Sequence, residues 1–249
     1  MSVKSAIEQY NKIRETRDII SGIHNYCDRW CERCGFTARC SVFAMGEEEE
    51  RIRKENNEPE KNMAEYVGSM LQDAMDLLHD LAREHGIDFN ALDDDEADIR
   101  KPGKDNYLVR KSDEHSRWLF KWFGKNNKKI ELTLARFKDS SNDDYLILKD
   151  AIDVLKWYIH FIAVKFSRAV MTPVDNSREG RSDNNGSAKI AIIAINRSIE
   201  ALALLLRFLP ETEDSLLEGL VRLERIKKRA IKDFPEALEF RRPGFDDAD

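Results

Sequence analysis

The sequence predicts an all-α fold, a helical bundle of five to six helices, from two observations. Only 11 of the 249 residues are glycine and 6 are proline, whereas β-sandwiches and barrels need many turns and therefore many such residues. Apolar residues also recur at helical spacing along most of the chain. With 41% hydrophobic and 35% charged residues, the chain has enough apolar surface for a folded core.

The first expected helix runs from Ser5 to about Ile23, and its apolar pattern continues toward Trp30. The charged stretch 46–61 reads as a solvated helical extension or linker. A second amphipathic helix covers about 61–85, and Gly86 can end it. We therefore expect one domain over 1–249, in which 1–45 holds the first helix and a cysteine segment and 61–235 forms the bundle core.

A third helix is expected at about 105–123, broken by the sequence GKNNKK. Residues 130–134 alternate apolar and polar side chains, but a helical continuation through Phe137 fits the surrounding sequence better than a strand. The most apolar segments, 144–171 and 187–209, predict two central helices that form a hairpin. A last amphipathic helix covers about 211–232.

The net charge of −6 gives no global basic field, so nucleic acid is not the favoured partner. No run of about 18 apolar residues exists that could span a membrane, and the N-terminal sequence lacks the apolar segment of a signal peptide. We expect a cytoplasmic protein without a membrane partner.

All four cysteines lie within 14 residues, at Cys27, Cys31, Cys34 and Cys40. In a reducing compartment, such clustering indicates ligand use rather than disulfides. On a helix, positions i, i+4 and i+7 share a face, so the first three thiols can converge. Gly35 then lets the chain leave the helix, and a turn can return Cys40 as the fourth ligand.

Four thiolates suit two centres, a [4Fe-4S] cluster and a structural zinc ion. Interleaved arginines, which are Arg29, Arg33 and Arg39, can offset the negative charge of either centre. The iron-sulfur centre predicts a redox or sensing protein with a protein or redox partner. The zinc centre predicts a non-catalytic interaction module, and a bland set of reduced thiols is the remaining alternative.

A second candidate lies where the central hairpin turns. Lys165 and Arg168 end the fourth expected helix, and Ser187 and Lys189 begin the fifth, with Ser187 as its N-cap. Lys165 and Arg168, together with Lys189 and the free backbone N–H groups of the fifth helix, could bind a small anionic ligand. The alternative is that these basic residues only complement a helix dipole.

Carboxylate and histidine side chains offer a third reading, a metalloenzyme site in the bundle core. Asp76 and His79 have the spacing of a di-iron motif, with His160 and Glu200 on other helices. The apolar stripe of its helix points Asp76 toward solvent, however, which argues against this site. The aspartate run near residue 94 reads as a solvated acidic loop.

The segments YCDRWCERCGFTARC, WYIHFIAVKFSRA and NNGSAKIAIIAINRSIEA resemble parts of a bacterial family of uncharacterised helical proteins. The last three cysteines, in CERCGFTARC, also resemble the iron-sulfur loop of endonuclease III and MutY-type DNA glycosylases. The chain lacks the helix-hairpin-helix signature of that family, so no glycosylase activity is implied. The radical-SAM spacing CxxxCxxC is set aside because that family uses an α/β barrel. The first resemblance implies a bacterial cytoplasmic protein of one domain and no particular activity.

Overall fold

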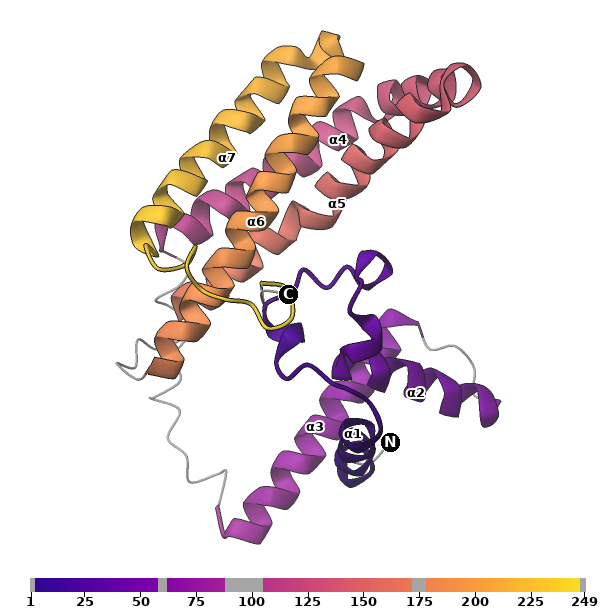
Figure 1. Ribbon diagram of the computed structural model, residues 1–249, viewed down its shortest axis with the longest axis vertical. Helices are drawn as coiled ribbons and strands as arrows, with labels where there is room; N and C mark the ends of the chain where they lie inside the picture. Colours follow the sequence, from indigo (N-terminus) through magenta and orange to yellow (C-terminus); the bar gives the residue numbers. More distant parts are fainter. Residues whose placement is uncertain (1–2, 58–61, 88–104, 172–177, 247–249) are drawn as a thin grey trace. The chain divides into compact units, whose positions relative to one another are not determined.

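The computed structural model describes residues 3–57, 62–87, 105–171 and 178–246 (Figure 1). Within these ranges lie seven α-helices and no strand, so the all-α prediction is confirmed. The count exceeds the predicted five to six because the charged stretch after the cysteines forms a helix of its own, α2 (Ser41–Glu55). Its exposed face is stabilised by ion pairs one turn apart, such as Arg51 with Glu48 and Glu55.

Backbone contacts divide the chain into two compact units. The first comprises residues 1–24, 29–98 and 243–249, and it contains α1 (Val3–Thr16), α2 and α3 (Met63–His85). The predicted bundle core of 61–235 included α3, which the structure instead groups with α1 and α2. Whether the chain is one domain stays a prediction.

The ends of α3 follow from its sequence. Asn62 accepts a hydrogen bond from the Glu65 N–H at 2.9 Å, and the Glu65 carboxylate accepts one from the Asn62 N–H at 3.1 Å. This reciprocal capping satisfies two N–H groups that the helix cannot pair internally. Gly86 ends α3 with a left-handed backbone, φ 66°, as the sequence predicted.

The second unit comprises residues 25–28 and 99–242 and is built on a four-helix bundle. Its helices are α4 (Tyr107–Ser140), α5 (Asn142–Met171), α6 (Arg178–Phe208) and α7 (Glu213–Asp233). Figure 1 shows the four helices side by side, and α5 packs against both α4 and α6. The predicted central hairpin of 144–171 and 187–209 is therefore confirmed as α5 and α6.

Helix α4 is longer than predicted, because it runs unbroken through the sequence GKNNKK. Asn126 is buried within that stretch and its side-chain amide donates to the Trp122 carbonyl at 2.9 Å, so its polar group is paired inside the helix. Helix α4 then passes through residues 130–134, as predicted. Ser141 alone separates α4 from α5.

The core of the bundle is aliphatic and aromatic. Fully buried members from all four helices include Leu108, Leu119, Leu155, Phe166, Ile195, Leu202 and Leu223. Each such side chain contributes about 1.5–3 kcal/mol of hydrophobic stabilisation relative to an exposed position. In the part of the chain that the structure describes, no helix is both long enough and apolar enough to cross a membrane.

Candidate metal centre

The cysteines lie on tight turns rather than on the predicted helix. Helix α1 ends at Thr16, and three single-turn 3₁₀ helices follow: η1 (Ile23–Asn25), η2 (Cys31–Arg33) and η3 (Thr37–Arg39). An α-helix cannot run through Gly22, at φ 73°, or Arg29, at φ 61°, because both have left-handed backbone. The prediction that three thiols share one helix face is therefore wrong.

Cys31 and Cys34 instead stand at the two ends of one 3₁₀ turn. The Cys34 N–H donates to the Cys31 carbonyl at 3.1 Å, which closes the turn. The Phe36 N–H then donates to the Cys34 sulfur at an N–S distance of 3.4 Å. Hydrogen bonds from N–H groups to cysteine sulfur also occur at iron-sulfur clusters, where they help to set the reduction potential.

Cys40 ends the next turn. Its N–H donates to the Thr37 carbonyl at 3.2 Å, and its backbone then becomes the N-cap of α2. The three cysteines of the first unit therefore follow one another through two successive tight turns. All four cysteines of the chain are half-buried, with no disulfide.

The predicted arginines have individual roles in the first unit. Arg39 pairs with the Asp18 carboxylate at 2.9 Å and also donates to the Asp18 carbonyl at 3.3 Å. The Arg33 guanidinium lies 3.7 Å from the centre of the Trp30 ring, a cation–π contact. Among the described residues, no three histidine, cysteine, aspartate or glutamate side chains are grouped closely enough to hold a metal ion. The four-thiolate centre therefore stays a prediction.

Cys27 belongs to the second unit, where its neighbours in sequence are bound to α5 and α6. The Asp28 carboxylate accepts hydrogen bonds from the Tyr158 hydroxyl at 2.7 Å and from Arg197 at 2.6 Å. The Trp157 indole donates to the Asp28 carbonyl at 3.0 Å. Burial, followed by the hydrogen bond to Asp28, raises the pKa of Tyr158 above its usual range, so its hydroxyl stays a donor.

Tyr26 forms the other half of this attachment. Its hydroxyl donates to Asp183 at 3.1 Å, and its ring packs edge-on against Phe240 with centroids 4.7 Å apart. The ring also lies against Gly186, where no side chain intervenes. Burial, followed by the charge of Asp183, raises the pKa of Tyr26 to about 12.

The residues of the predicted anion site are placed differently from the prediction. Helix α6 begins at Arg178, so Ser187 is a buried interior residue and not an N-cap. The helix continues through this polar sequence, and the cations bond within the unit. Lys165 donates to the Asn25 carbonyl at 3.4 Å, Arg168 pairs with Asp183 at 2.6 Å, and Lys189 donates to the Phe240 carbonyl at 2.5 Å.

The side chains of the predicted carboxylate and histidine site are all exposed, namely Asp76, His79, His160 and Glu200. Asp76 is turned to solvent as its stripe predicted, and it accepts a hydrogen bond from Gln72 at 2.9 Å. The acidic run near residue 94 lies outside the described residues.

Sequence reasoning missed His115. The residue is 3% exposed on α4, and neither ring nitrogen has a hydrogen-bond partner among the described residues. Its ring stacks on Trp118 with centroids 5.4 Å apart. Burial, followed by the charge of Arg222, lowers the pKa of His115 to about 4. The signal was present, because His115 is seven residues after Leu108 and four before Leu119, both buried on the same stripe.

The fold and the cysteine loop together define an all-α protein with a four-helix bundle and a thiol-rich segment of tight turns. Comparison with protein-family models, with curated proteins and with solved structures finds no match.

Proposed function

We propose that this chain is a metal-thiolate protein that carries a [4Fe-4S] cluster on Cys27, Cys31, Cys34 and Cys40 and has a redox or sensing role. The observation that carries the proposal is the turn at Cys34, where the Phe36 N–H is directed at the Cys34 sulfur at 3.4 Å. Hydrogen bonds to cysteine sulfur are among the features by which proteins tune iron-sulfur clusters.

Chain lengths between the ligands also support the proposal. Cys31 and Cys34 are separated by one closed turn, and Cys40 follows after another. Cys27 is four residues before Cys31, and an extended chain of that length spans about 13 Å, so the backbone has ample reach for four ligands on one centre. The four cysteines are free of disulfides, and four cysteine sulfurs are the donor set that such a cluster uses.

Zinc is the alternative, and one observation favours it. Residues 17–40 contain only three single-turn 3₁₀ helices, so this part of the chain has little regular structure to stabilise it. Structural zinc supplies folding free energy to segments of this kind. In that case the chain is a zinc-stabilised interaction module without catalysis.

The test is anaerobic purification of the full chain, followed by measurement of iron, acid-labile sulfide and zinc. An iron-sulfur protein is brown, whereas zinc, with a filled d shell, gives no colour. We expect four iron and four sulfide per chain, lost in the variant Cys34→Ser. The control is Glu32→Gln, an exposed substitution in the same turn. Zinc in place of iron would select the alternative, and metal-free protein would refute both.

A further inference from the structure

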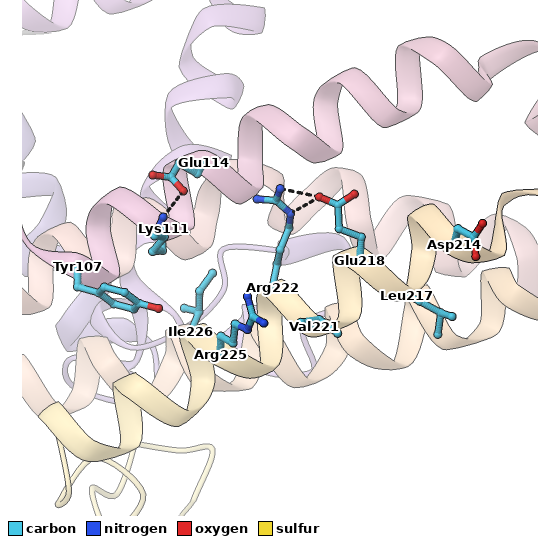
Figure 2. A pocket seen from close by; sticks show the side chains of 10 residues that line it. All are labelled: Tyr107, Lys111, Glu114, Asp214, Leu217, Glu218, Val221, Arg222, Arg225 and Ile226. Carbon is cyan, nitrogen blue, oxygen red and sulfur yellow. Dashed lines mark hydrogen bonds and ion pairs between the residues drawn. The ribbon is translucent and has the colours of Figure 1, made fainter.

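A hollow lies between α4 and α7 in the second unit, on the bundle and apart from the cysteine loop in sequence. Its volume is about 610 Å³, within the range of small-molecule sites. Figure 2 shows Tyr107 at one end of the row of lining side chains and Asp214 at the other. The hollow therefore has the size of a ligand site and lies wholly within the four-helix bundle.

One part of the lining is apolar. Leu217 and Val221 of α7 are 43% and 48% exposed. They are therefore apolar side chains at positions where a surface helix usually carries polar residues. They are four residues apart, so successive turns of α7 present them side by side along the hollow. The half-buried ring of Tyr107 adds further apolar surface, whereas Ile226 is only 2% exposed. A ligand with an apolar body would remove this surface from water.

The cations of the lining differ in their pairing. Lys111 pairs with Glu114 at 2.6 Å, and Arg222 pairs with Glu218 at 2.6 Å, so each has a carboxylate from the same hollow (Figure 2). Arg225 is exposed and has no carboxylate partner among the residues that the structure describes. An anion placed here would therefore meet a guanidinium that is not already neutralised.

Tyr107 also has a cation beside its ring. The Arg229 guanidinium lies 5.0 Å from the centre of the Tyr107 ring, and it pairs with the Asp233 carboxylate at 2.7 Å. The two acidic lining residues of α7, Asp214 and Glu218, both lie closer to its N-terminus than Arg225 does, and Glu218 is already bound to Arg222. Glu224, next to Arg225 in sequence, pairs with Lys227 at 3.9 Å. The apolar ring and the unpaired guanidinium thus lie toward the same end of the hollow.

We propose that this hollow binds a small organic carboxylate with a compact apolar body. Arg225 binds the carboxylate, because a guanidinium can donate two parallel hydrogen bonds to it. Tyr107 and Val221 contact the apolar body. An inorganic anion would leave the apolar wall exposed to water, and a neutral hydrocarbon would leave Arg225 without a partner, so both parts of the ligand are required.

The experiment is isothermal titration calorimetry of the full chain with 2-naphthoate as the probe. We expect saturable binding with one site per chain. The neutral analogue 2-naphthamide and the small anion acetate should each bind at least about tenfold more weakly. The amide lacks the negative charge that Arg225 binds, and acetate lacks the apolar body. Equal affinity for naphthoate and naphthamide would overturn the assignment of Arg225.

Variants locate the site. Arg225→Gln and Val221→Ser change exposed side chains, so both should fold, and each should weaken naphthoate binding, the first by roughly 10- to 100-fold. Arg225→Lys should recover part of the lost affinity, because lysine restores the positive charge but not the two parallel N–H donors of the guanidinium. The control is Lys228→Gln, which removes one exposed positive charge from α7 outside the hollow. The proposal is overturned if wild-type chain shows no saturable binding, or if Arg225→Gln and Lys228→Gln bind naphthoate alike.

Discussion

The Tyr158 hydroxyl donates a 2.7 Å hydrogen bond to the Asp28 carboxylate, and Arg197 donates to both groups at 2.6 Å. This triangle joins a residue beside Cys27 to two helices of the bundle, α5 and α6. The Tyr158 side chain is fully buried, so its hydroxyl depends on these partners rather than on water.

Removal of that hydroxyl should weaken the attachment of residues 25–28. We expect Tyr158→Phe to lower the free energy of unfolding by about 1 to 2 kcal/mol, because Asp28 loses a donor that water replaces only in part. The measurement is urea unfolding at pH 7. Tyr145→Phe is the matched control on α5, since no hydroxyl partner of Tyr145 exists among the described residues. Equal losses in both variants would contradict a specific role for Tyr158.

Gly186 tests the packing of Tyr26. A Cβ at this position would lie 2.4 Å from the Tyr26 ring and 2.8 Å from the Phe240 ring, closer than atoms can pack. We expect Gly186→Ala to destabilise the protein by about 1 to 3 kcal/mol despite the better helix propensity of alanine. The control is Gly124→Ala in α4, where nothing lies within 4 Å, and it should be neutral or stabilising by up to about 1 kcal/mol. Thermal unfolding of both variants checks the contrast.

Helical periodicity predicted the bundle well because most of its apolar residues lie on helices that bury one face. The same signal misled at the first helix. Ile23 fits the helical pattern and is 2% exposed, but it is buried from a 3₁₀ turn after Gly22. Apolar spacing reports which side chains are buried, and the backbone between them can still turn.

Polar sequence misled in the opposite direction at α4 and α6. The stretch GKNNKK does not break α4, because Asn126 pairs with the carbonyl of Trp122 and Gly124 meets no obstacle. Helix α6 begins before Ser187 because Asp183 finds partners in Tyr26 and Arg168. The Asn126 contact is local, within one helical turn. Asp183, however, pairs with Tyr26 and Arg168, which are 157 and 15 residues away, so local propensity could not reveal where α6 begins.

Because His115 is buried, the free energy of unfolding should depend on pH in the interval between the folded-state and unfolded-state pKa values of this residue. Its pKa is lowered to about 4 in the folded protein, below the ordinary 6.5 of the unfolded chain. Between these values the unfolded state binds more protons, so stability rises with pH and is lost as the pH falls from 6.5 toward 4. The full loss is roughly 3 kcal/mol.

The variant His115→Leu should remove that part of the pH dependence. Leucine leaves no unpaired ring nitrogen in the core, so stability at pH 7 should change little or increase. Urea unfolding midpoints at several pH values between 7 and 4 measure the difference in stability between the two proteins. The carboxylates are the same in both proteins, so their titration does not contribute to this difference. Parallel curves for wild type and variant would show that His115 stays neutral or finds a partner on protonation.

Metal removal should loosen the cysteine turns and leave the bundle core intact. The N–H groups of Cys34 and Cys40 each close a single turn, and single turns are marginal without further constraint. A bound metal would hold the thiols and so protect these amides, whereas Leu155 and Leu202 are protected by burial in the bundle. Hydrogen exchange of the chain before and after chelation should therefore show faster exchange across residues 31–40 and unchanged exchange in α5 and α6. Unaltered exchange across the turns would mean that they are stable without a metal, and the structural role of the cysteines would then have to be abandoned.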